Sequence, residues 1–169
     1  PALTVALPAG DVTVPTVCDG PADPADAWIA VALAHGAGAG LEHPFLAGFA
    51  GALAEQGVAT LRFAFPYREA GRRMPGPPAH AVATWVAVMA ELGRRAPGVP
   101  HVAAGQSYGG RLASVAAAAS STRTDRVNVP SSRRESICKA SCSASDQRTR
   151  WVQPSLLSIN QRAAASPSK

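Results

Sequence analysis

The sequence lacks the features that would place it in a membrane or in a secretory pathway. Its longest uninterrupted apolar run covers only residues 27–34, whereas a membrane-spanning helix needs about 20 apolar residues. The N-terminus has no basic region followed by an apolar stretch, which is the pattern of a secretory signal. We therefore expect no membrane segment and a cytoplasmic location.

Cysteine is also scarce, with three residues in 169. That number is too small and too uneven for a disulfide framework. Cys138 and Cys142 have no second pair and no later histidine, so the spacing disfavours a zinc site. We expect no bound metal and no cofactor.

Glycine is missing from the last fifty residues, although the chain contains 15. All of them precede residue 120, whereas twelve serines and both lysines follow residue 119. Residues 1–119 carry a net charge of −1 and residues 120–169 a net charge of +6, within a total of +5. The sequence therefore predicts two parts: a domain segment, 1–119, and a Ser/Arg-rich tail, 120–169, that is disordered or non-native. A shifted reading frame, a truncation or a fusion near residue 119 would explain the change.

The first part alternates between strand and helix patterns. Apolar runs that end in glycine or proline indicate buried strands, and helical stripes of apolar residues separate them. An N-terminal hairpin precedes them, and a loop is expected at residues 66–78. The expected hairpin strands are residues 3–7 and 12–17, the core strands are residues 28–34, 58–65 and 101–104, and the helices are residues 45–53, 82–92 and 108–119.

Such alternation predicts an α/β fold with a mainly parallel sheet and helices on both faces. The alternation stops after the third helix, where a sheet of this class would need further strands. We therefore expect an open sheet edge beyond residues 101–104 and an irregular tail.

The strongest chemical motif is Gly105-Gln106-Ser107-Tyr108-Gly109, which lies between an expected strand and an expected helix. This is the pattern and context of a nucleophile elbow, in which a sharp turn exposes the serine. Glycines two residues to either side avoid a collision, and the helix N-terminus offers free N–H groups to a developing oxyanion. We expect Ser107 to be a nucleophile and the Tyr108 N–H an oxyanion donor. The alternative is a glycine-rich turn with an incidental serine.

A second glycine-rich segment, residues 35–40, follows the first core strand and begins with His35 and Gly36. Glycines there allow the backbone to approach a substrate, and such a loop supplies the second oxyanion donor, which we assign to the Ala37 N–H. A dinucleotide site is disfavoured because its fingerprint requires glycine where Leu41 stands. His35 precedes the first helix, so we expect it to shape the loop rather than act as a base.

Four segments in register give the chain a family resemblance. They are residues 35–44, 61–67, 71–73 and 105–114, and the likeness extends over about residues 3–119. The chain resembles bacterial α/β hydrolases related to dienelactone hydrolase, in the branch shared with the hydrolase-like domain of a chromatin non-specific-lethal complex subunit and of a testis-expressed protein. The resemblance implies an α/β-hydrolase fold, with Ser107 as nucleophile and the Ala37 and Tyr108 N–H groups as oxyanion hole. Four residues match the family's segment after the second core strand, where they contact substrate or anchor the loop: Arg62, Tyr67, Arg72 and Arg73.

The chain departs from that family in its catalytic base. An acid and then a histidine should follow the nucleophile, but all four histidines precede Ser107. Asp125, Glu135 and Asp146 do follow it, yet none comes after a recognisable strand. A serine without a base is a weak nucleophile.

Two functions follow from these residues. The first is a serine hydrolase that cleaves an ester or similar acyl bond of a small molecule, inactive in this chain because no histidine follows Ser107. The alternative is a non-catalytic hydrolase-like scaffold or interaction module. The basic tail has dispersed charges and one aromatic residue, Trp151, which disfavours nucleic acid as a partner. The sequence does not define an oligomeric state.

Overall fold

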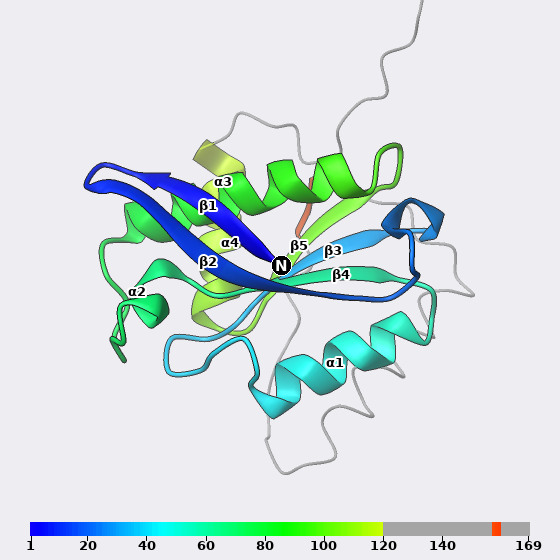
Figure 1. The fold of residues 1–169 in the computed structure, drawn as a ribbon, viewed down its shortest axis with the longest axis horizontal. Coiled ribbons are helices and arrows are strands. Elements are labelled where there is room, and N and C mark those ends of the chain that lie inside the picture. The colour runs from blue at the N-terminus through cyan, green and yellow to red at the C-terminus, as the bar shows by residue number, and fades with distance from the viewer. Residues whose placement is uncertain (120–156, 160–169) are drawn as a thin grey trace, which may run out of the picture.

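A mixed sheet forms the centre of the structure, and the chain enters it through a hairpin (Figure 1). The structure, a computed structural model, describes residues 1–119 and 157–159. Strands β3, β4 and β5 are parallel, and the remaining neighbours pair antiparallel. In sheet order the strands are β1 (Ala2–Leu7), β2 (Gly10–Asp19), β4 (Ala59–Phe63), β3 (Ala30–Ala34), β5 (His101–Gly105) and β6 (Leu157–Ile159).

Helices cover both faces of the sheet, as the sequence predicts. Figure 1 shows α1 on one side of the strands, with α3 and α4 on the other. Within the described ranges, no helix is long and apolar enough to cross a membrane. The helices are α1 (Pro44–Ala54), α2 (Pro66–Glu69), α3 (Pro78–Arg95) and α4 (Tyr108–Ala119), with a 3₁₀ turn at Pro24–Asp26.

The central strand β3 explains how the two faces differ. Its large residues, Val31 and Leu33, pack with α1, while Ala30, Ala32 and Ala34 face α3 and α4. Alternate side chains of a strand point to opposite faces of its sheet. The face with alanines lets α4 approach the strands closely, and the elbow lies at the start of that helix.

Two of the expected boundaries were wrong. The segment 66–78, expected as a loop, begins with the short helix α2, because Pro66 occupies the first helical position and its fixed φ suits a helix start. The helix expected at residues 82–92 is longer than predicted, because α3 begins at Pro78 and continues to Arg95. By contrast, Gly57 after α1 has a φ of 71°, as expected of a residue that terminates a helix.

The edge beyond β5 is partly covered, contrary to the expectation of an open edge. Strand β6 pairs antiparallel with β5, from His101 opposite Ile159 to Ala103 opposite Leu157. The prediction that the tail is irregular lies otherwise outside the described residues, as do Cys138, Cys142 and Trp151.

Trp85 connects α3 to the elbow, and its removal tests that connection. The buried indole donates a hydrogen bond from Nε1 to the Gly109 carbonyl at 3.2 Å. We expect Trp85→Phe to lower the free energy of unfolding by about 1–3 kcal/mol, from the lost hydrogen bond and a small cavity. Urea unfolding followed by circular dichroism measures this. The neighbouring Val86→Ala, at a half-exposed position, is the control, and an equal loss in both variants would contradict the assignment.

Candidate active site

Ser107 occupies the sharp turn between β5 and α4 that the sequence predicts. Its φ is +49°, and it is the sole non-glycine residue with a positive φ in the part of the chain that the structure describes. An L-residue in this region is strained by about 1–3 kcal/mol and persists only where the surroundings impose it. The turn leaves the Ser107 side chain exposed.

The glycines around Ser107 are required by close backbone contacts. A Cβ on Gly105 would lie 2.7 Å from the Gly110 nitrogen, and one on Gly109 would lie 2.7 Å from the His35 oxygen. A Cβ on Gly110 would lie 2.6 Å from the Gly105 oxygen. The elbow and the start of the 35–40 loop are therefore in direct contact through their backbones.

Two backbone N–H groups at this contact have no partner among the described residues. Tyr108 is the first residue of α4, where amides have no partner within the helix. Neither Tyr108 nor Ala37 donates a backbone hydrogen bond to any described residue. The Gln106 N–H, in contrast, bonds to the Ala34 oxygen at 3.0 Å and joins the two segments.

His35 is fully buried, and both of its ring nitrogens are engaged. Nε2 accepts a hydrogen bond from the Phe65 N–H at 3.3 Å, which requires Nδ1 to carry the proton and donate to the Gly36 oxygen at 2.7 Å. Burial lowers the pKa of His35, the hydrogen bond to Gly36 opposes this, and the charges of Arg68 and His43 lower it further. His35 is therefore a neutral residue that shapes the loop.

The hydrogen bond from His35 fixes the peptide that presents Ala37. The Gly36 carbonyl and the Ala37 N–H belong to one planar peptide unit. Holding the carbonyl consequently orients the N–H, and donation to the carbonyl also polarises the unit. On the next peptide, the Tyr67 hydroxyl donates to the Ala37 carbonyl at 2.7 Å. Ala37 is thus held on both sides.

Aromatic rings pack against both the 35–40 loop and the elbow. Tyr67 lies edge-on to His35 and to Tyr108, with centroids 6.1 Å and 6.3 Å apart. Phe65 contacts the same three rings. Burial raises the pKa of Tyr67 and that of Tyr108, so both phenols stay protonated near neutral pH.

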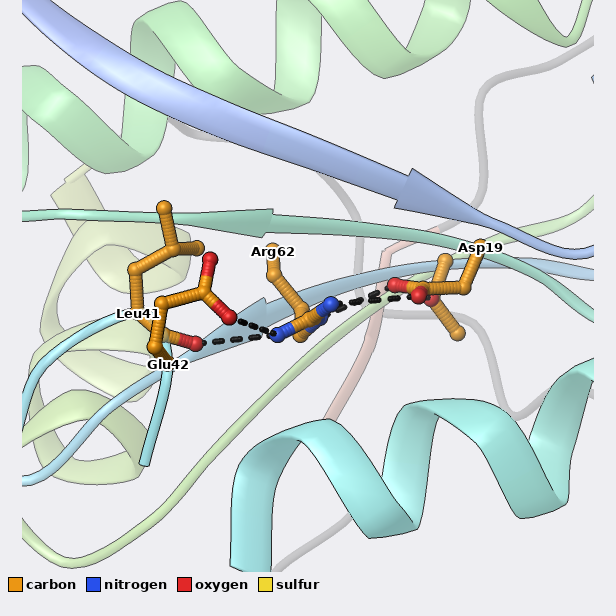
Figure 2. Close-up of polar contacts among 5 residues, drawn as sticks. Asp19, Leu41, Glu42 and Arg62 are labelled. Carbon is orange, nitrogen blue, oxygen red and sulfur yellow. Dashed lines mark hydrogen bonds and ion pairs between the residues drawn. The ribbon is translucent and has the colours of Figure 1, made fainter. Parts of the chain in front are cut away.

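Arg62 lies apart from Ser107, on β4, in a buried polar cluster (Figure 2). Its guanidinium holds Asp19 through two hydrogen bonds, Nε to Oδ2 at 2.9 Å and Nη2 to Oδ1 at 3.1 Å. Nη1 donates to the Leu41 carbonyl at 3.0 Å and lies 3.6 Å from Glu42. Arg62 therefore anchors the chain just after the 35–40 loop.

Asp19 was missed by the sequence reasoning, since it ends a hairpin strand 43 residues away from Arg62. The signal was Arg62 itself, because an arginine inside an apolar strand needs an acidic partner. Arg72 and Arg73, the other arginines of the matching segment, are exposed.

Among the described residues, no histidine forms a hydrogen bond with Ser107. His35 bonds through Nδ1 to the Gly36 oxygen in the 35–40 loop. His101, at the start of β5, bonds through Nε2 to the Ala96 oxygen at 2.9 Å. His43 precedes α1 and His80 lies in the first turn of α3. Asp125, Glu135 and Asp146 lie outside the described residues.

The steric requirement for glycine can be tested with two helical positions. We expect Gly109→Ala to lower the free energy of unfolding by about 3 kcal/mol, because the new Cβ would overlap backbone that cannot move alone. Gly48→Ala in α1, where a Cβ meets nothing within 4 Å, should raise it by about 0.5–1 kcal/mol. Chemical denaturation of both variants measures the difference, and a neutral Gly109→Ala would refute the close contact.

The buried neutral His35 predicts acid sensitivity. Its folded pKa lies below the unfolded value of about 6.5, so on acidification the unfolded chain takes up the proton first. Above about pH 6.5, the contribution of His35 to the free energy of unfolding does not change with pH. As the pH drops from there to the pKa of His35 in the folded protein, the free energy of unfolding falls by at most about 1.4 kcal/mol per pH unit. We expect His35→Gln to flatten this slope in unfolding measurements between pH 7 and 5. Equal slopes in both proteins would show that His35 does not titrate in this way.

Comparison with known proteins was made for sequence and for structure. A family model described as an alpha/beta hydrolase domain matches residues 27–129, more than half of the chain. No match was found among curated proteins.

Several solved structures have a similar fold. Est1E from Butyrivibrio proteoclasticus is 21% identical, with a TM-score of 0.54, and the match covers 70% of this chain and 46% of that one. XC6422 from Xanthomonas campestris, described as an α/β serine hydrolase without a lid, is 25% identical, with a TM-score of 0.52 and coverage of 70% and 56%. An α/β serine hydrolase homologue from Coxiella burnetii is 20% identical, with a TM-score of 0.52 and coverage of 69% and 56%.

The chain thus spans about half the length of the solved structures that it matches. Its mainly parallel sheet with helices on both faces agrees with the match of the family model. The chain belongs to the α/β hydrolase domain family.

Proposed function

We propose that this protein is a serine hydrolase that cleaves an ester or similar acyl bond of a small molecule through an acyl-enzyme at Ser107. The observation that carries the proposal is the strained, exposed Ser107 at a strand–helix turn, beside a Tyr108 amide that has no partner among the described residues. An elbow of this kind presents a nucleophile at the edge of the sheet.

The reaction follows from the groups around that turn. The Ser107 Oγ attacks the carbonyl carbon and gives its proton to a base, while the carbonyl electrons move to the oxygen. The N–H groups of Ala37 and Tyr108 bind the resulting oxyanion. The tetrahedral intermediate collapses to the acyl-enzyme, and the alcohol leaves with a proton from the same base. Water then attacks the acyl-enzyme by the reverse sequence and regenerates Ser107.

The residues around Ala37 support this role through preorganisation. Donors that are already oriented need not be rearranged as charge develops. His35 and Tyr67 hold the carbonyls of Gly36 and Ala37, so the Ala37 N–H is fixed before substrate binds. His35 belongs to the binding loop and Tyr67 to its support, and neither takes a proton from Ser107.

The base is the part that this chain does not supply. All four histidines precede Ser107, and a triad in the family's order needs an acid and then a histidine after the nucleophile. Loss of one triad member costs several orders of magnitude in rate. We propose that the 169-residue chain is inactive, and that a longer form with a downstream acid and histidine is active.

A fluorophosphonate probe tests the nucleophile. We expect it to label such a longer form rapidly and the 169-residue chain far more slowly. Ser107→Ala should abolish labelling and the turnover of p-nitrophenyl acetate. Ser114→Ala is the control, because Ser114 is on the same helix and bonds back to the Gly110 carbonyl.

Labelling that survives Ser107→Ala would place the nucleophile elsewhere. A longer form with an acid and a histidine after Ser107 that is not labelled at all would contradict catalysis. That result would leave the non-catalytic scaffold as the function.

A further inference from the structure

The arginines of residues 1–119 fall into two groups according to their partners. Three of them, Arg62, Arg94 and Arg95, form ion pairs with carboxylates. The other four have no ion pair with any residue that the structure describes. These four are Arg68, Arg72, Arg73 and Arg111, called here the unpaired arginines.

Arg68 lies against the loop that carries Ala37. A Cβ built on Gly40 would lie 3.8 Å from its Nη2 atom. Its charge also reaches His35 and Tyr67, where it lowers the pKa of each, secondary to the effect of burial. The guanidinium is only half-buried, so it borders the loop while remaining accessible to a ligand.

Arg72 and Arg73 are exposed on the segment that turns back beside Arg68. The Arg72 N–H bonds to the Tyr67 carbonyl at 2.9 Å, and its own carbonyl accepts a bond from Arg68 Nη1 at 3.4 Å. Tyr67 in turn holds Ala37. This segment is therefore linked by successive hydrogen bonds to the proposed oxyanion donor.

Arg111 approaches the same site from α4. It lies one helical turn after Ser107, and its N–H bonds to the Ser107 carbonyl at 3.0 Å. Both side chains are exposed. Burial raises the pKa of Tyr108, and the nearby charge of Arg111 acts in the opposite direction. Arg68 thus acts on Tyr67 and Arg111 on Tyr108, two residues whose ring centroids lie 6.3 Å apart.

Few acids balance this charge. Glu42, after the 35–40 loop, already faces Arg62, and Glu69 is exposed at the end of α2. Arg94 and Arg95, by contrast, lie at the C-terminal end of α3 and share Glu91. Unpaired cations attract anions to the surface that carries them. The difference between the unpaired arginines and the paired Arg94 and Arg95 therefore points to an anionic ligand rather than to a generally basic surface.

We propose that Arg68, Arg72 and Arg111 bind a phosphate group carried by the acyl substrate, which makes the substrate a phosphorylated ester or thioester. The inference rests on the proposed function only in treating the bound group as part of an acyl substrate. Guanidinium groups match phosphate oxygens with paired hydrogen bonds. Three cations also exceed what one carboxylate would neutralise, whereas a phosphate carries up to two charges.

Phenyl phosphate and benzoate are matched probes, because they share a ring and differ in the anionic group. Each is titrated at constant ionic strength into the isotope-labelled 169-residue chain, and amide shifts are followed by NMR. We expect phenyl phosphate to shift amides in residues 36–41, 68–73 and 107–112, and to bind at least about tenfold more tightly than benzoate. The double variant Arg68→Gln/Arg72→Gln should weaken it at least about tenfold.

Arg94→Gln is the control for Arg68→Gln and for Arg72→Gln, because it removes the same charge. Arg94 is exposed and lies at the C-terminal end of α3. This substitution should leave the affinity unchanged. Equal weakening by Arg94→Gln, equal binding of benzoate, or shifts confined to residues 120–169 would each overturn the proposal. Ser107→Ala removes probe labelling without removing the arginines, so failure of phosphate binding and failure of catalysis are distinguishable.

Discussion

The close backbone contact between the elbow and the end of β3 is the constraint on which the site depends. Gly105, Gly109 and Gly110 bring α4 against residues 34 and 35 at distances that exclude any Cβ. At this contact Ser107 has a positive φ, and the Tyr108 amide lies in the first turn of α4. Without this approach, the two N–H groups proposed as oxyanion donors would belong to separate loops. The alanines of β3 serve the same purpose in the sheet, because they keep α4 near the strands.

A buried histidine completes the arrangement that the glycines begin. Glycines permit the 35–40 loop to lie near the elbow, but they do not select one conformation of it. His35 does so, since its two nitrogens join the Gly36 carbonyl to the amide of Phe65, the residue that precedes α2. Burying a polar ring is favourable only when both nitrogens are bonded. The neutral ring therefore gives the loop rigidity at neutral pH and loses that role when it is protonated.

Local patterns predicted most of the fold and the elbow, while long-range pairs escaped prediction. The strands and helices of residues 1–119 were confirmed because their apolar periodicity and glycine positions are local signals. The pairing of Arg62 with Asp19 joins residues far apart in sequence, and nothing near Asp19 marks it. The hydrogen bond from Phe65 to His35 also leaves no signal in the sequence, because its donor is a backbone amide that every residue but proline has. The helix α2 was overlooked because proline ends a strand and also begins a helix.

Positive charge near Ser107 and the need for a base act on different steps. In the proposed reaction, the unpaired arginines and the N-terminus of α4 would stabilise negative charge on an anionic substrate and on an oxyanion. They do not accept a proton, because a guanidinium remains protonated at any physiological pH. In the proposed reaction, the positive charge of these groups therefore adds to substrate binding and to stabilisation of the transition state, but it does not activate the serine hydroxyl. A chain with the elbow, both donors and the arginines still needs a histidine after Ser107, and its sequence places all four before it.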